Sequence, residues 1–171
     1  FFQLSLGEEN NLLNAGEPAL PRVNRSIIIP DDARMDVKIL QADYVDFENM
    51  PIVPSKGEIP RTILKSDVPY TFGEVYNEDA FYPGHIVDVT EPFIFRDFRG
   101  TVVKFNAFQH NPTTNALRVY KSLTVEIVVA GPGEVNVLER DKNEIKLVDE
   151  FERIYKNNFI NFSEANNRFP M

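Results

Sequence analysis

The segment GTVVKFNAFQHNPTTNALRVYKSLTVEIVV, from Gly100 to Val129, carries the clearest information about the fold. It contains two runs, Gly100 to Phe108 and Leu117 to Val129, in which apolar side chains recur at every second position. This period of two is typical of strands with one buried face. The residues between them, Asn111 to Asn115, are of types that favour turns. The segment therefore predicts a β-hairpin.

Shorter patterns of the same kind lie on both sides of the hairpin. They predict strands at Phe2–Leu6, Ser26–Ile29, Met35–Ile39 with a continuation through Val45 and Phe47, His85–Val89, Pro92–Phe95, Glu134–Leu138 and Glu144–Val148. Turn-forming residues separate these strands at near-regular spacing. We therefore expect an all-β fold, an antiparallel β-sandwich of jelly-roll type, rather than alternating strands and helices.

The period of the apolar residues changes near the C-terminus. Phe151, Ile154, Tyr155 and Phe159 fall at helical spacing with charged residues between them, which predicts one short amphipathic helix. Residues 163–171 then form a polar tail. With 171 residues, the chain suits a single domain, 1–171, that buries roughly two-thirds of the surface its unfolded form exposes.

Composition excludes several classes of function. The formal charge of −8 argues against a nucleic-acid surface, which needs clustered basic residues. With no cysteine, the chain can form no disulfide, thiolate nucleophile or zinc–thiolate site. No apolar run approaches the ~18 residues of a membrane span. The sequence opens on Phe1 rather than methionine, which we interpret as removal or omission of a leader.

A long segment without any regular period, PSKGEIPRTILKSDVP, runs from Pro54 to Pro69. Its prolines at 54, 60 and 69 fix φ, lack an N–H and disfavour helix in the residue before them, so we expect an extended, exposed loop. Arg61 lies near its middle. Ordered loops of this length are often functional, which suggests insertion of Arg61 into the cleft of a partner. A mobile surface loop with a solvated arginine is the alternative.

The sequence offers little to support catalysis or metal binding. His85 and His110 lack partners at metal-ligand spacing, and Asp141, Asn143 and Glu144 do not match a calcium-binding EF-hand loop. Serine and threonine occur in no nucleophile-elbow context, and no glycine-rich phosphate loop follows a strand. We therefore predict no catalytic residue, no metal site and no cofactor.

Several motifs, taken in order, resemble one family of propeptides. They are GEPALP at Gly16–Pro21, PSKGEIPR at Pro54–Arg61, YNEDAFYPG at Tyr76–Gly84, PFIFRDFRGTVVKF at Pro92–Phe105, QHNPTTNALRVY at Gln109–Tyr120 and FERIYKNNF at Phe151–Phe159. Together they resemble the N-terminal prodomain of gingipain-type cysteine peptidases, clan CD enzymes of family C25, and most closely the arginine-specific members. The resemblance covers nearly the whole chain from about Gly16 onward.

The resemblance implies a regulator and not an enzyme. Such a prodomain docks on its own peptidase, assists its folding and keeps it latent by projecting a loop into the cleft. The resemblance places Ile59, Pro60, Arg61 and Thr62 in the inhibitory loop, with Arg61 in the S1 specificity pocket. It also predicts cleavage after Arg168, at the end of the polar tail that leads to the catalytic domain.

The implied partner is the cognate C25 peptidase, in a secreted or periplasmic bacterial protein, with no nucleic acid, membrane span or obligate oligomer. Two other interpretations stay open. A carbohydrate-binding sandwich module fits the predicted fold and the 12% aromatic content, although the chain has no tryptophan and most of its aromatic residues fall at core-facing positions. A purely structural module leaves the long loop unexplained.

Overall fold

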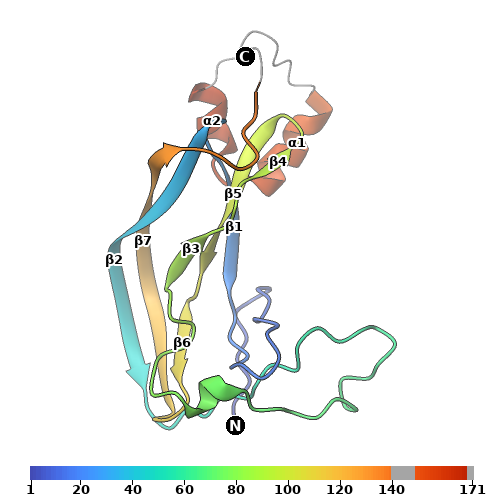
Figure 1. Ribbon diagram of the computed structural model, residues 1–171, viewed down its shortest axis with the longest axis vertical. Helices are drawn as coiled ribbons and strands as arrows, with labels where there is room; N and C mark the ends of the chain where they lie inside the picture. The colour runs from blue at the N-terminus through green and yellow to red at the C-terminus, as the bar shows by residue number, and fades with distance from the viewer. Residues whose placement is uncertain (140–148, 169–171) are drawn as a thin grey trace. The chain divides into compact units, whose positions relative to one another are not determined.

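The computed structural model describes residues 1–139 and 149–168 (Figure 1). Its elements are β1 (Val23–Ile28), β2 (Ala33–Phe47), the 3-10 helix η1 (Glu74–Asn77), β3 (Val87–Val89), β4 (Phe93–Phe95), β5 (Phe98–Phe105), β6 (Phe108–Asn111), β7 (Ala116–Pro132), α1 (Asp149–Asn158) and α2 (Phe162–Arg168). The fold class is confirmed, since the chain is mostly antiparallel β-structure with short helices near its C-terminus.

The strands form two sheets. One has the order β1-β5-β3, with β4 pairing with β5, and the other has the order β2-β7-β6. The predicted hairpin is present as β6 and β7, which pair from Phe108 opposite Val119 to Asn111 opposite Ala116. The Asn111 side-chain oxygen accepts hydrogen bonds from the amides of Thr113 (3.1 Å) and Thr114 (3.2 Å) and so closes the turn.

The first run of the predicted hairpin is not one continuous strand. It divides into β5 and β6, which belong to different sheets. At the division, the Asn106 amide donates to the carbonyl of Ile86 (2.8 Å) and its side-chain nitrogen donates to the carbonyl of His85 (2.7 Å). Because of these contacts, the backbone at Asn106 does not continue the hydrogen-bonding pattern of the β5 strand. β5 instead forms a second hairpin with β4, in which Phe93 lies opposite Gly100.

Two of the shorter strand predictions were wrong. Phe2–Leu6 contributes only isolated bridges, from Phe2 to Ile52 and from Leu6 to Glu9. Glu134–Leu138 forms no strand, because its backbone bonds to a turn instead: the Leu138 amide donates to the carbonyl of Asp31 (3.0 Å). The predicted strand at Glu144–Val148 and the weak calcium-like cluster at Asp141, Asn143 and Glu144 lie outside the described residues.

The predicted helix is confirmed as α1. A second helix, α2, begins at Phe162 and extends to Arg168, into the segment 163–171 that we expected to be a polar tail. The chain divides into two compact units. Unit 1 comprises Phe1–Val23, Ile39–Val87 and Phe105–Thr124, and unit 2 comprises Asn24–Lys38, Asp88–Lys104 and Val125–Met171. The assignment of 1–171 to a single domain stays a prediction.

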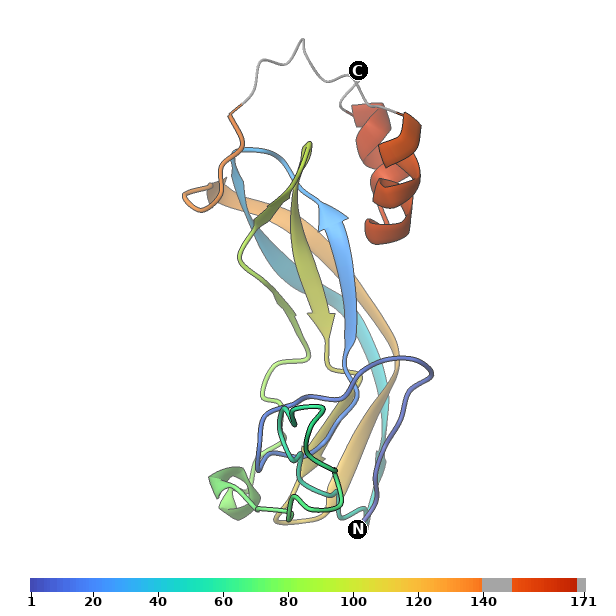
Figure 2. The same cartoon turned by 90° about the vertical axis from the view of Figure 1, so that its right-hand side faces the viewer.

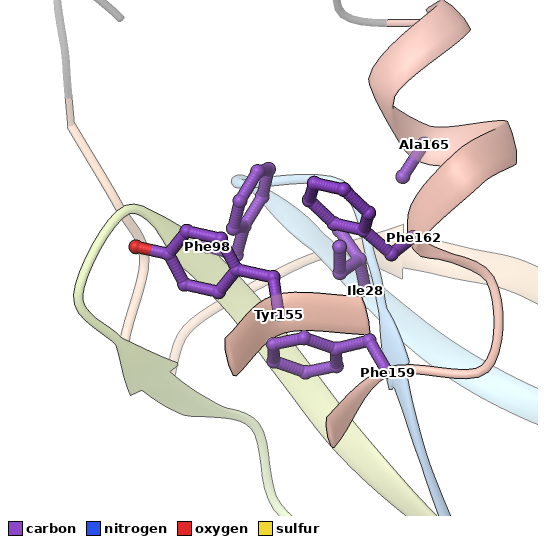
Figure 3. Packing of buried hydrophobic residues seen from close by; sticks show 6 residues of the cluster. All are labelled: Ile28, Phe98, Tyr155, Phe159, Phe162 and Ala165. Atoms are coloured by element: carbon purple, nitrogen blue, oxygen red, sulfur yellow. The ribbon is translucent and has the colours of Figure 1, made fainter. Parts of the chain in front are cut away.

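The core of unit 2 joins both helices to β1 and β5 (Figure 3). Its buried residues are Ile28, Phe98, Tyr155, Phe159, Phe162 and Ala165. The ring of Phe98 meets Tyr155 edge to face, with centroids 4.8 Å apart, a favoured aromatic geometry. The Asn161 side chain also bonds to both the amide and the carbonyl of Ile28, each at 2.8 Å. The helices are therefore held to the strand by packing and by hydrogen bonds.

Arg99 is the most unusual buried residue of unit 2, with 1% of its surface exposed. Its guanidinium donates to the carbonyls of Pro30 (2.8 Å), Ala33 (2.6 Å), Val135 (2.9 Å) and Asn136 (2.8 Å). A buried cation is costly unless it is hydrogen-bonded, and here four carbonyls compensate for the lost water. One side chain thereby joins the turn before β2 to the segment after β7.

Replacement of Arg99 by methionine should destabilise the chain by about 3 kcal/mol, because four partly or fully buried carbonyls lose their donor. Urea unfolding followed by circular dichroism measures this change. Arg153→Met is the control, since Arg153 is exposed on α1. Equal unfolding midpoints for the two variants would contradict the stabilising role of Arg99.

The core of unit 1 is formed by Leu12, Leu20, Ile52 and Leu117. His110, on β6, is fully buried, and neither of its ring nitrogens has a hydrogen-bond partner among the described residues. Burial disfavours the charged imidazolium and lowers the pKa of His110 to about 4, against a smaller opposing effect of the Met50 backbone. His110 is therefore neutral in the folded chain at pH 7.

The lowered pKa makes stability depend on pH. Between pH 6.5 and 4 the unfolded chain binds a proton at His110 that the folded chain does not, so the stability present above pH 6.5 falls as the pH falls. We expect a loss of about 1–2 kcal/mol, discounted for solvent screening, relative to the non-titrating variant His110→Leu. Unfolding free energies of both proteins at pH 7 and pH 4.5 test this. Parallel pH profiles would show that His110 does not titrate in this way.

Candidate functional site

The segment 54–70 contains no helix or strand and extends from unit 1 as an open loop (Figures 1 and 2). Nearly all of its residues from Glu58 to Tyr70 are exposed. The prediction of an exposed loop without helix or strand is confirmed, although turns at Pro60–Ile63 and Leu64–Asp67 interrupt its extended course. The geometry of the loop is determined by its base, its neck and its tip.

Gly16 holds both ends of the loop base. Its amide donates to the carbonyl of Ser55 (2.9 Å), and its carbonyl accepts from the amide of Gly73 (2.8 Å). Gly16 has a φ of +84°, and a Cβ there would lie 3.1 Å from the backbone nitrogen of Gly73. Both the left-handed backbone and the close approach favour glycine. One residue of the GEPALP motif thus closes the loop.

Further hydrogen bonds align the rest of GEPALP with the chain entering the loop. The Ser55 amide donates to the carbonyl of Glu17 (2.7 Å), and the Ala19 amide donates to the carbonyl of Val53 (3.0 Å). Pro18 and Pro54, which lie between these bonds, are both buried. The loop therefore begins from a packed and hydrogen-bonded base.

The neck of the loop lies just beyond this base. The Lys56 ammonium donates to the carbonyl of Lys65 at 2.7 Å and lies 4.3 Å from the centroid of the Tyr70 ring. The Ser55 hydroxyl accepts from the amide of Gly57 (3.1 Å), whose φ is +75°. Lys56, Ile59, Lys65 and Tyr70 also line a cavity of about 360 Å³ beside the neck.

A tight turn forms the tip. The Ile63 amide donates to the carbonyl of Pro60 (3.0 Å), which places Arg61 and Thr62 at the two central positions of the turn. Arg61 is exposed and has no hydrogen bond or ion pair to any residue in the described part of the chain. Ile63 and Leu64, which follow it, are 46% and 69% exposed. The tip thus presents a cation with free donors next to two apolar side chains.

The structure brings together four of the five predicted site residues. Ile59, Pro60, Arg61 and Thr62 are consecutive at the tip of the loop in unit 1, with Ile59 half-buried against the cavity. Arg168, the predicted processing site, is the last residue of α2 in unit 2. The roles assigned to these residues stay predictions.

Sequence reasoning missed the residues that hold the loop, Gly16, Lys56, Tyr70 and Gly73. Two glycines on either side of a non-periodic segment were an available signal for a close backbone approach. Lys56 gave no such signal, because a lysine in an exposed loop usually points into water.

The described residues show no group of three acidic, histidine or cysteine side chains able to hold a metal ion. Nor does any helix in that part of the chain have the length and apolar character that a membrane crossing requires.

Comparison with known proteins identifies relatives over nearly the whole chain. The family model Propeptide_C25 matches residues 1–169, so the similarity includes the N-terminal segment before Gly16. Gingipain R2 of Porphyromonas gingivalis is 36% identical over 161 residues, which are 94% of this chain and 22% of that protein. Gingipain R1 of the same species is 36% identical over 147 residues, 86% of this chain and 15% of that protein.

Two solved structures have the same fold. In the complex of Porphyromonas gingivalis RgpB pro- and mature domains, one chain matches with a TM-score of 0.80 and 37% identity, over 92% of this chain and 77% of that one. A structure on the zymogenic latency of gingipain K matches with a TM-score of 0.61 and 18% identity, over 72% of this chain and 71% of that one, and supports the fold alone.

This chain spans less than a quarter of the length of the curated relatives that it matches. The predicted resemblance is therefore confirmed. The chain belongs to the C25 propeptide family, the propeptides of gingipain-type cysteine peptidases.

Proposed function

We propose that this propeptide keeps a cognate C25 cysteine peptidase latent by inserting the 54–70 loop into its cleft, with Arg61 in the S1 pocket. The observation that carries the proposal is the state of Arg61, an exposed guanidinium at the tip of an anchored turn with no partner in the described part of the chain. Family membership favours this interpretation over a carbohydrate-binding or structural module.

The chemistry of the tip suits an arginine-selecting pocket. Such a pocket needs an acidic group and acceptors arranged for the planar guanidinium, and charge-assisted hydrogen bonds of this kind contribute about 1.5–3 kcal/mol each. The exposed Ile63 and Leu64 add apolar surface next to the cation. Pro60 fixes φ beside Arg61 and lowers the entropy lost on docking.

The loop is too small to account for stable inhibition alone. Stable protein–protein interfaces bury on the order of 1,200–2,000 Å² in total. The RgpB relative was solved as a complex of pro- and mature domains, which supports docking of this chain on a mature domain. We infer that the body of the propeptide supplies most of that interface and also assists folding of the peptidase.

Release of the peptidase is proposed to follow cleavage after Arg168. Arg168 is the last residue of α2 that the structure describes. The proposal rests on the family resemblance, by which Arg168 in Asn167-Arg168-Phe169 lies where members of the family are cleaved. By family, we expect the precursor to be exported from a bacterial cell.

Arg61→Ala should raise the inhibition constant of this chain against an arginine-specific C25 peptidase at least ~30-fold, corresponding to ~2 kcal/mol for a binding hot spot. Steady-state inhibition assays measure this change. Arg153→Ala removes the same charge from α1 of unit 2 and serves as the control. A synthetic 54–70 peptide that inhibits as strongly as the whole chain would contradict the need for a docking surface.

Arg168→Gln, made in a precursor that joins this chain to its peptidase, should slow maturation at this site at least ~10-fold, because an arginine-specific enzyme loses its recognised side chain. Electrophoresis with N-terminal sequencing of the mature enzyme tests this, and we expect the unmodified precursor to yield a product that begins at Phe169. Arg153→Gln is the matched control. An unchanged product and rate in Arg168→Gln would place the processing site elsewhere.

A further inference from the structure

We propose that Lys56 is a positioning residue, which joins the two limbs of the loop and holds its tip in the conformation that a peptidase pocket accepts. Lys56 and Lys65 are nine positions apart, yet the Lys56 ammonium reaches the Lys65 carbonyl at 2.7 Å. The inference rests on the proposed function, since it assigns a role within the same loop.

The neck has the geometry that this role requires. Gly57, with its φ of +75°, turns the entering limb, and the Ser55 hydroxyl accepts its amide hydrogen bond. The Lys56 side chain then crosses to the returning limb, where it meets a carbonyl oxygen and the ring of Tyr70. A charge-assisted hydrogen bond and a cation–π contact on one ammonium favour a single rotamer over many solvated ones.

If the hydrogen bonds of Gly16 were the only restraint, the loop between Ser55 and Gly73 would be long. Gly16 joins Ser55 to Gly73, so the chain between them has many conformations unless another contact restricts it. The Lys56 contact closes a shorter loop around the turn at Pro60–Ile63. Arg61 is therefore presented from a segment restrained at two levels.

Restraint of this kind affects binding through the population of the competent conformation. If only a fraction of free molecules has the tip in its binding geometry, the apparent dissociation constant rises by the inverse of that fraction. Loss of the neck contact that lowers the fraction to about one tenth therefore weakens binding about tenfold. The change should appear in the association rate, since contacts in the complex are unaltered.

The loop itself provides a matched control. Lys65 contributes its backbone carbonyl to the contact, and its own side chain has no hydrogen bond or ion pair within 1–139 and 149–168. Lys65→Met thus removes the same charge as Lys56→Met and keeps the acceptor. Lys56→Arg retains a cation able to reach the carbonyl and stack on Tyr70, and so tests for rescue.

The three variants and the unmodified chain are compared by amide hydrogen exchange across residues 57–64 and by association and dissociation rates with an arginine-specific C25 peptidase. We expect Lys56→Met to raise exchange in this segment and to lower the association rate about tenfold, with an unchanged dissociation rate and unfolding midpoint. Lys65→Met should show the hydrogen exchange of the unmodified chain across residues 57–64, and Lys56→Arg should recover most of the loss caused by Lys56→Met.

Equal exchange for Lys56→Met and Lys65→Met, together with an association rate of Lys56→Met equal to that of the unmodified chain, would overturn the positioning role. Failure of the proposed function has a different signature, namely an Arg61→Ala variant that binds as the unmodified chain does. Hydrogen exchange is measured without a peptidase, so it shows whether Lys56 orders the tip even if the proposed function is wrong. In an Arg61→Ala background, Lys56→Met should add little further loss of binding, because the two residues act through one contact.

Discussion

The loop depends first on the backbone of Gly16. Its N–H and C=O bond to the segments that enter and leave the loop. A Cβ at this position would lie 3.1 Å from the backbone nitrogen of Gly73. The positive φ adds a second requirement for glycine. Both hydrogen bonds involve backbone atoms alone, so no side chain takes part in this anchor. A Cβ on Gly73 would lie 3.0 Å from the Gly16 carbonyl oxygen, so the close approach constrains both glycines.

The period of the apolar residues predicted the elements whose structure depends on local sequence. The long apolar alternations of β2 and β7 and the helical spacing in α1 all appear as expected. The division between β5 and β6 could not be foreseen, since Asn106 leaves the ladder through bonds to His85 and Ile86, about twenty residues away. Phe2–Leu6 has the correct period for a strand but makes only isolated bridges.

The candidate site shows the same contrast between features set by local sequence and features set by tertiary contacts. Prolines at 54, 60 and 69 were sufficient to predict an exposed loop and to draw attention to Arg61. What holds that loop depends on tertiary contacts of Gly16 and Lys56 with residues that the sequence does not place beside them. The burial of Arg99 could not be predicted either, because nothing in RDFRG indicates the four carbonyls, distant in sequence, that accept from its guanidinium.

Three arginines show why the setting of a guanidinium, and not its presence, indicates function. Arg99 directs its donors to four backbone carbonyls, and Arg118 forms a bidentate pair with Asp46 at 2.9 and 2.8 Å. Both guanidinium groups thus make hydrogen bonds within the fold. Arg61 has no such partner in the described part of the chain and stands on a turn whose geometry is fixed by other residues. A guanidinium has five donors, and a pocket with matching acceptors can replace the hydrogen bonds that Arg61 makes to water. Because the backbone beneath it is already restrained, docking costs less conformational entropy. For these reasons we assign recognition to Arg61 rather than to Arg99 or Arg118.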